Sequence, residues 1–301
     1  MQSNVIQSNA WFLKPAVFVA LLWVFFFSIA KAADGAPEVT DPNTWKWNDP
    51  QDLQIPGMHH GTIESTSMKR TVGFNIYLPP QYEKEPARRF PVVYFLHGST
   101  GTESSDAGLA RYVHAEIVAG SIEPVIYIFP NGGAESGYRD WPDSYVKSET
   151  LIVRELLPYI DREYRTIAQP GSRGICGFSM GGGGAMRLAL KYPKLFGTAA
   201  SLAAALEQTA EDFGRDNCYR HASALSQNDR NRLYLYFAVG EDDSLYLQHG
   251  PFLKYLNELG IRYTYVVHSK VTHNLGVYTE LSGRAMIEHL SRELARNRSG
   301  P

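Results

Sequence analysis

Residues 173–190 read RGICGFSMGGGGAMRLAL and form the most informative stretch of the chain. A short apolar run, Ile175–Phe178, leads into a Gly-x-Ser-x-Gly pentapeptide at 177–181, and small residues that favour a helix follow it. This order predicts a sharp strand-to-helix turn with Ser179 at its tip. The flanking glycines lack the Cβ atoms that would collide where strand and helix cross. Because the start of the helix directs partial positive charge at the serine, we expect Ser179 to be a nucleophile.

A phosphate-binding loop is the alternative interpretation of these glycines. Such a loop needs the pattern Gly-x-x-x-x-Gly-Lys-[Ser/Thr], and the sequence contains no such match. We therefore favour the catalytic interpretation.

Apolar runs and helical stretches alternate along the rest of the chain. The expected strands are His60–Met68, Thr71–Leu78, Val92–Leu96, Val125–Phe129, Ile175–Phe178, Leu233–Val239 and Tyr263–His268. The expected helices are Gly108–Val118, Tyr145–Tyr164, Gly181–Tyr192, Phe252–Leu259 and Thr279–Leu294. Runs with few alternating polar residues are typical of strands that are buried on both faces. The sequence therefore predicts an α/β protein with a mostly parallel central sheet and helices on both faces.

Charge and cysteine content exclude several classes of protein. Among 301 residues, 29 Lys and Arg stand against 31 Asp and Glu, which gives a formal net charge of -2. Proteins that bind nucleic acid usually carry a basic excess, so we expect no nucleic-acid partner. The two cysteines, Cys176 and Cys218, are too few for a disulfide-built scaffold or a cysteine zinc site, and the sequence leaves their pairing open.

The N-terminus has the pattern of a secretory signal. An apolar run at 16–29 is shorter than the roughly 20 residues that a membrane span needs. Ala30-Lys31-Ala32 follows it and fits the small-x-small cleavage rule. An uncleaved N-terminal anchor is the alternative.

We expect three parts of the chain: a signal peptide at 1–32, an N-terminal arm or linker at 33–57 and a single α/β domain at 58–301. The mature protein would begin at Ala33. We expect it to be secreted or periplasmic, without stable insertion in a membrane.

A nucleophilic serine needs a general base and an acid that orients the base. After a serine elbow of this kind, the acid and then the histidine follow along the chain. The stretch after Leu233–Val239 contains adjacent carboxylates, of which Asp243 is our first choice and Asp242 the second. His273 follows the expected strand Tyr263–His268 and is the expected base, with His268 as the alternative.

An oxyanion hole needs two backbone N–H groups. Met180 directly follows the nucleophile and is the first expected donor, and Ser99, after the strand Val92–Leu96, is the second. We expect His97 to be a structural hydrogen-bonding residue. Tyr138 and Trp141 belong to an aromatic loop that either lines a substrate pocket or simply packs.

With these residues assembled, the chain resembles the esterase family of α/β-hydrolases, which includes feruloyl esterases, enterochelin-esterase-like proteins, S-formylglutathione hydrolases and mycolyltransferases. The resemblance covers about residues 58–295. Its motifs are Tyr77–Tyr82, Leu96–Gly98, Phe129–Gly132, Glu155–Asp161, Tyr164–Thr166, Gly177–Gly182, Lys191–Pro193 with Leu195-Phe196, and Gly240–Asp243. The resemblance implies the α/β-hydrolase fold, Asp243 as the acid, and Ser99 and Met180 as the oxyanion donors. Residues 201–205 depart from the Ser-Gly turn that many members keep, which concerns the wall of the pocket.

We therefore expect a secreted serine carboxylesterase that works through an acyl-enzyme and needs neither a metal nor an organic cofactor. Its expected partners are small-molecule or polysaccharide-linked esters, with acyl or feruloyl esters of polysaccharides and siderophore esters as options. An acyltransferase with the same three residues is one alternative, and a non-catalytic binding module is the other. The sequence does not determine the oligomeric state.

Overall fold

The computed structural model describes residues 3–7, 45–142, 145–214 and 216–298. The predicted signal run at 16–29 and its cleavage site lie outside these residues. The strands are β1 (Ser3–Gln7), β2 (Met58–Ser65), β3 (Arg70–Tyr77), β4 (Val92–Leu96), β5 (Ile126–Pro130), β6 (Arg173–Phe178), β7 (Thr198–Leu202), β8 (Tyr234–Gly240) and β9 (Arg262–His268).

The α-helices are α1 (Gln81–Lys84), α2 (Ala110–Val118), α3 (Ser148–Thr150), α4 (Leu157–Glu163), α5 (Met180–Lys191), α6 (Cys218–Ala224), α7 (Gln227–Arg232), α8 (Tyr246–Glu258), α9 (Leu275–Tyr278) and α10 (Arg284–Arg298). Shorter 3-10 or π segments are η1 (Ala107–Leu109), η2 (Leu151–Leu156), η3 (Pro170–Ser172) and η4 (Thr279–Gly283). Within the described residues, no helix is long and apolar enough to span a bilayer.

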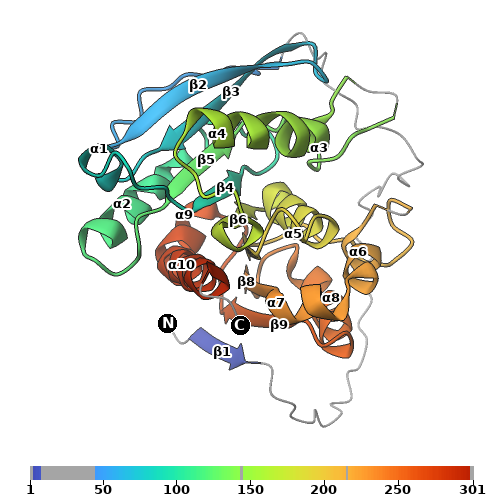
Figure 1. The fold of residues 1–301 in the computed structure, drawn as a ribbon. Coiled ribbons are helices and arrows are strands. Elements are labelled where there is room, and N and C mark those ends of the chain that lie inside the picture. The colour runs from blue at the N-terminus through green and yellow to red at the C-terminus, as the bar shows by residue number, and fades with distance from the viewer. Residues whose placement is uncertain (1–2, 8–44, 143–144, 215, 299–301) are drawn as a thin grey trace, which may run out of the picture.

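One sheet forms the centre of the molecule, with the strand order β1-β9-β8-β7-β6-β4-β5-β3-β2 (Figure 1). The strands from β4 to β9 run parallel, whereas β2, β3 and β1 pair antiparallel at the two edges. This arrangement confirms the predicted α/β-hydrolase fold. In the parallel register Leu96 pairs with Gly177, and Phe178 pairs with Leu202. The carboxyl ends of the central strands therefore meet at one edge of the sheet.

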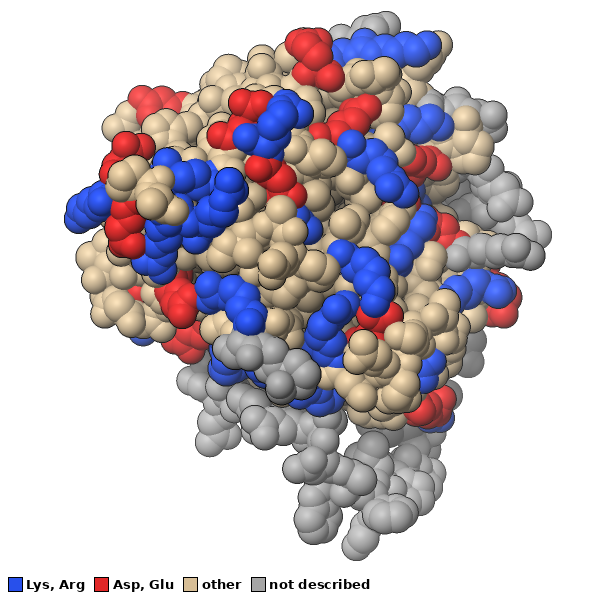
Figure 2. Space-filling view, in the orientation of Figure 1, with Lys and Arg blue, Asp and Glu red and all other residues tan. Residues whose placement is uncertain are grey.

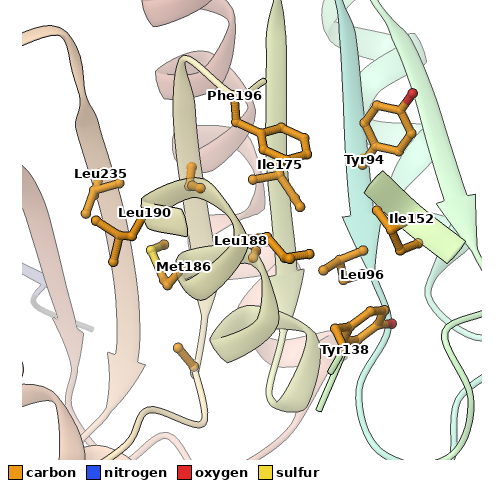
Figure 3. Packing of buried hydrophobic residues seen from close by; sticks show 14 of the residues in the cluster. Tyr94, Leu96, Tyr138, Ile152, Ile175, Met186, Leu188, Leu190, Phe196 and Leu235 are labelled. Carbon is orange, nitrogen blue, oxygen red and sulfur yellow. The ribbon is translucent and has the colours of Figure 1, made fainter. Parts of the chain in front are cut away.

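Alternate residues of each central strand pack on opposite faces of the sheet, as the apolar runs predict. In β4, Tyr94 and Leu96 join the cluster beneath α5, where Leu188 and Met186 also lie (Figure 3). Val93 and Phe95 of the same strand join a second cluster formed with α2 and α10. Both faces are covered by helices, so the sheet is buried and its carboxyl edge is left for the site.

The surface has charges of both signs close together. On the face seen in Figure 1, basic side chains gather over the middle, with acidic side chains between and around them (Figure 2). Opposite charges also form ion pairs between exposed side chains, such as Arg88–Glu85 at 3.1 Å.

Four elements differ from the sequence prediction. The long helix expected from Tyr145 begins only at Ser148, and Tyr145 is 65% exposed. β7 was not expected, because its small residues give little of the apolar signal that marks the other strands. α6 and α7 were also not expected. They are short and polar, and the asparagine and serine that begin them, Asn217 and Ser226, cap them through side-chain hydrogen bonds.

Candidate active site

Ser179 lies in the turn between β6 and α5, with φ of 55° and ψ of -120°. Few non-glycine residues adopt a positive φ, so the turn is strained at the serine. A Cβ added at Gly181 would lie 2.0 Å from the carbonyl oxygen of Leu96, and one added at Gly177 would lie 2.5 Å from the backbone of Gly181. Both glycines are therefore required for the close approach of β4, β6 and α5.

A hydrogen-bonded chain connects Ser179 with two residues from distant parts of the sequence. Ser179 Oγ lies 2.9 Å from His273 Nε2, and His273 Nδ1 lies 2.8 Å from Asp243 Oδ2. Asp243 follows β8, and His273 lies in the turn between β9 and α9. The Asp243 side chain is fully buried, whereas that of His273 is one-third exposed. The structure thus brings the three expected residues into hydrogen-bonding order.

The two alternative residues lie elsewhere. Asp242 is exposed and does not contact the imidazole of His273. His268 is buried, and its Nε2 lies 2.6 Å from Ser282 Oγ. Burial lowers the pKa of His268. Of the alternatives that the sequence left open, Asp243 and His273 are therefore the residues in the hydrogen-bonded chain with Ser179.

Two aromatic residues complete the surroundings of this chain, and the sequence analysis assigned a role to neither. The ring of Phe178 stacks on the imidazole of His273, with 4.7 Å between ring centroids. The Tyr278 hydroxyl donates a 2.7 Å hydrogen bond to Asp243 Oδ2. No motif marks Tyr278, because its contact with Asp243 joins residues that are 35 positions apart.

The loop after β4 presents one of the two expected oxyanion donors. The N–H groups of Gly98, Thr100 and Gly101 all donate hydrogen bonds, to Asp106 Oδ2, Ala134 O and Gly98 O respectively. The N–H of Ser99 donates to no acceptor among the described residues. The second expected donor, the N–H of Met180, lies at the start of α5, where a helix offers its own N–H groups no carbonyl. These two amides remain available for a ligand oxygen.

His97 fixes this loop rather than reacting. The Gly132 N–H donates to His97 Nε2 at 2.9 Å, so the proton lies on Nδ1, which donates to Gly98 O at 2.7 Å. Burial lowers the pKa of His97 to about 4, so the ring is neutral at physiological pH. Asp106 holds the other side of the loop, and burial raises the pKa of its carboxyl to about 6.

The described part of the N-terminal arm, residues 45–57, is bound to the segment that follows this loop. The Asp49 carboxylate accepts a 2.9 Å hydrogen bond from Thr102 Oγ1, and its carbonyl oxygen accepts one of 2.7 Å from Ser104 Oγ. The buried Glu103 carboxylate accepts hydrogen bonds from Asp49 N and Asn131 Nδ2. Residues 45–57 of the expected arm or linker therefore lie against the domain.

A cavity of about 370 Å³ opens next to Ser179. Its lining includes Ser99, Met180, Trp141, Phe213 and Gln248. Trp141 and the exposed Phe213 form an edge-to-face pair, with ring centroids 6.1 Å apart. Trp141 therefore lies where the aromatic-loop prediction placed a pocket residue.

The same prediction is wrong for Tyr138. This residue is fully buried and does not line the cavity. Its ring fills the space beside Gly132 and Gly184, where an added Cβ would lie 2.1 Å and 2.8 Å from ring atoms. Its hydroxyl donates to the carbonyl oxygen of His97 at 3.1 Å, and the ring lies in the core beneath α5 (Figure 3). Tyr138 thus packs behind Gly184, which lines the cavity, and does not line the cavity itself.

A network of paired charges forms one wall of the cavity. Arg187 is buried and lies 2.6 Å from Glu149 and 2.9 Å from Asp216. Arg139 binds Glu207 and lies 2.8 Å from Asp216. Although burial favours the neutral acid, the His221 hydrogen bond and the Arg187 charge hold the pKa of Asp216 well below its usual value. Because each charge has an opposite partner, this wall is close to neutral.

At residues 201–205, where many members of the family have a Ser-Gly turn, this chain has an alanine with an unusual backbone conformation. Ala203 has a φ of 46°, a conformation that glycine adopts more easily. The N–H of Ala205 donates to the carbonyl oxygen of Ser179 at 2.9 Å, which ties this turn to the nucleophile.

Cys176 and Cys218 are free and buried, so the structure has no disulfide between them. Among the described residues, no group of three or more His, Cys, Asp or Glu side chains is arranged to hold a metal ion.

Comparison with known proteins gives consistent matches. The chain is 32% identical over 149 residues to the esterase Rv1288 of Mycobacterium tuberculosis, which covers 48% of this chain and 32% of that protein. It is 30% identical over 155 residues to an endo-1,4-beta-xylanase/feruloyl esterase of Xylanibacter ruminicola, which covers 46% of this chain and 21% of that protein. The chain thus spans well under two thirds of the length of these relatives.

A solved structure of a ferulic acid esterase has the same fold. Its TM-score is 0.70 at 22% identity, and the match covers 78% of this chain and 98% of that one. A family model described as a putative esterase matches residues 65–288, which is more than half of the chain. The chain therefore belongs to the esterase family.

Proposed function

We propose that this protein is a serine carboxylesterase that hydrolyses carboxylic esters through an acyl-enzyme. The observation that carries the proposal is the hydrogen-bonded chain from Ser179 through His273 to Asp243. Ser179 is the nucleophile, His273 the general base and acid, and Asp243 the group that orients the imidazole.

In the first half-reaction, Ser179 Oγ bonds to the ester carbonyl carbon while its proton moves to His273 Nε2. The carbonyl π electrons move onto the oxygen, which the N–H groups of Ser99 and Met180 stabilise. When this tetrahedral intermediate collapses, the bond to the alcohol oxygen breaks. The alcohol leaves with the proton from His273 Nε2, and the acyl group remains on Ser179.

In the second half-reaction, a water molecule takes the place of the alcohol. Its proton moves to His273 Nε2 as its oxygen bonds to the acyl carbon, and the same two amides hold the oxyanion. Collapse breaks the bond to Ser179 Oγ, which recovers the proton. The products are a carboxylic acid and the free serine.

The cavity is the proposed site of the acyl group. Its lining includes Ser99 and Met180, which hold the carbonyl oxygen, but not His273. The alcohol must lie next to His273, because His273 protonates it. The acyl group then extends into the cavity towards Trp141 and Phe213, and the alcohol lies on the open side.

These positions fit an ester with an acyl group that packs on aromatic side chains and an alcohol of unrestricted size. We therefore infer acyl or feruloyl esters of polysaccharides as the substrates. The name of the Xylanibacter ruminicola relative, which includes a feruloyl esterase, supports this substrate class.

We further propose that the protein is secreted or periplasmic after cleavage at Ala32. Cleavage would remove β1, which pairs with β9, so β9 would be an edge strand of the mature protein. N-terminal sequencing of the exported protein should give Ala33 or a neighbouring residue. A membrane-held protein that retains Met1 would contradict this proposal.

A fluorophosphonate probe tests the catalytic proposal directly. The probe should label the wild-type protein but not Ser179→Ala, and a panel of p-nitrophenyl esters with methyl ferulate and acetylated xylan should define the acyl preference. Unlabelled wild-type protein would favour a non-catalytic binding module. Acyl transfer to an added sugar in preference to water would identify an acyltransferase.

A further inference from the structure

The Tyr278 hydroxyl contacts the acid of the proposed catalytic residues but takes no part in the mechanism above. Tyr278 is fully buried at the end of α9. Its hydroxyl lies 2.7 Å from Asp243 Oδ2, the same oxygen that accepts the hydrogen bond from His273 Nδ1. The other oxygen, Asp243 Oδ1, accepts a 2.8 Å hydrogen bond from Leu245 N. The carboxylate therefore has three donors.

A second contact fixes the direction of the Tyr278 hydrogen bond. The N–H of Gly240 donates to the tyrosine oxygen at 2.7 Å, so the hydroxyl proton is left to point at Asp243. Burial and the Asp243 hydrogen bond both raise the pKa of Tyr278, so the hydroxyl keeps its proton at any working pH. The donor is permanent, and it ties the end of β8 to α9.

Two donors on one oxygen share its negative charge. The charge of Asp243 that stabilises the imidazolium of His273 is therefore smaller than it would be without Tyr278. The shared bond also prevents the carboxylate from rotating away from the imidazole. We propose that Tyr278 is a positioning residue that holds Asp243 in place and reduces the basicity of His273, which sets the acidic limit of activity. The inference rests on the proposed esterase function.

Several other titratable groups lie near Asp243 and His273. His249 on α8 interacts with Asp243, and burial lowers its pKa to about 4. His268 at the end of β9 binds Ser282 and is also buried. The remaining groups are Glu241 and Asp242 in the turn with Asp243, Lys270 in the turn with His273, Tyr265 beside Tyr278, and Tyr246 beside Tyr265. Apart from His273 itself, Tyr278 is the only described residue that hydrogen-bonds to Asp243 Oδ2, the carboxylate oxygen that faces His273.

The first test removes the hydroxyl with Tyr278→Phe. We expect the acidic limb of the pH profile of kcat/KM to move to higher pH by about half a unit or more, since one hydrogen bond to a charged group is lost. We expect kcat to fall several-fold while KM changes little, because the carboxylate is less well held. Tyr94→Phe is the matched control: Tyr94 is equally buried, but its hydroxyl has no hydrogen-bond partner among the described residues.

The second test changes the donor without removing it. A 3-fluorotyrosine at position 278 keeps the ring and the hydroxyl but makes the hydroxyl a stronger donor. The acidic limb should then move to lower pH, opposite to the shift in Tyr278→Phe. Because this substitution preserves the packing, it remains informative even if Tyr278→Phe folds poorly.

A measurement that does not depend on ester hydrolysis tests this inference separately from the proposed function. The His273 Nδ1 proton should give a downfield resonance in proton NMR, and its titration can be followed in the Ser179→Ala background. Tyr278→Phe should move this titration to higher pH, and 3-fluorotyrosine should move it to lower pH. Shifts of the same sign in both variants, or none in folded protein, would overturn the inference even if the protein is an esterase. Opposite shifts without ester hydrolysis would support it while the proposed function fails.

Discussion

Phe178 lies face to face with His273, with ring centroids 4.7 Å apart and an interplanar angle of 25°. The same ring lies 6.1 Å from Tyr278. Phe178 directly precedes Ser179 in the chain, so the strained turn at Ser179 also places an aromatic face against the imidazole. A ring in this position packs on the neutral imidazole and attracts the imidazolium that forms during the proposed reaction.

Phe178→Leu should lower kcat/KM by about two- to fivefold, because about 0.5–1 kcal/mol of cation–π attraction is lost at a partly exposed site. Phe178→Tyr keeps the aromatic face and is the matched control. Steady-state kinetics on a p-nitrophenyl ester give both values. Equal activity in Phe178→Leu and wild type would mean that the stack is packing alone.

Asp243→Asn should reduce kcat by about 10⁴-fold, by analogy with the effect of neutralising a triad acid in a serine protease. The amide can donate to His273 Nδ1 and favour the wrong tautomer of the imidazole. Asp242→Asn is the control, because Asp242 is the exposed neighbour in the same turn. A larger loss in Asp242→Asn than in Asp243→Asn would reverse the assignment of the acid.

Asp49→Ala should lower kcat several-fold with little change in KM. The Asp49 carboxylate accepts a hydrogen bond from Thr102 Oγ1, three residues beyond Ser99, so its loss should loosen the segment that carries one oxyanion donor. Asp52→Ala is the matched control on the same arm, because the Asp52 carboxylate bonds only to Gln54 among the described residues. If both variants lose activity equally, the effect comes from the arm in general.

The nature of each signal explains how much of this site the sequence could predict. Ser179 lies in a contiguous motif, and chain order restricts Asp243 and His273, so local patterns were sufficient for these expectations. Tyr138 shows the limit of such patterns. An aromatic residue in a loop near the site suggested a pocket wall, but its φ of 54° turns the ring into the core. Only the three-dimensional packing against Gly132 and Gly184 settles its position.

Contacts between distant segments could not be predicted either, because they too depend on three-dimensional packing and not on local sequence patterns. The hydrogen bond between Asp49 and Thr102 joins residues 53 positions apart, and Tyr278 reaches Asp243 across 35. Neither pair has a spacing that a motif could mark. β7 was missed because Thr198–Leu202 contains mostly small residues, and its strand character comes from its position between β6 and β8.

Acid should destabilise the fold between about pH 6.5 and pH 4. Burial lowers the pKa values of His97, His249 and His289 to about 4, from 6.5 in the unfolded chain. In this window the unfolded state binds more protons, so the free energy of unfolding falls as pH falls, by up to about 1.4 kcal/mol per pH unit for each group. Asp106, with its pKa raised to about 6, acts in the opposite direction and offsets part of this loss.

Urea unfolding at a series of pH values measures this dependence. His289→Gln removes one of the three titrating groups and should make the dependence less steep. A free energy of unfolding that rises on acidification from pH 6.5 to pH 5 would contradict the assignment of these histidines as neutral in the folded protein.

Ser179 and His273 should behave as a single functional unit. Ser179 Oγ needs His273 Nε2, 2.9 Å away, to accept its proton, so removal of either group should abolish the same step. Ser179→Ala, His273→Ala and the double variant should therefore lose similar activity, and the amides of Ser99 and Met180 should leave a small residual rate.

The thermal midpoints of these three variants should stay close to that of the wild type. His273 is one-third exposed and Ser179 lies in an open site, so neither side chain fills the core. The change at His273 should be small, because the buried carboxylate of Asp243 still accepts hydrogen bonds from Tyr278 and Leu245 when the imidazole is removed. Steady-state kinetics measure the loss of activity in each variant, and calorimetry measures the thermal midpoints. A loss in the double variant equal to the product of the single losses would mean that His273 acts independently of Ser179. Hydrolysis at nearly the wild-type rate in Ser179→Ala would exclude this serine as the nucleophile.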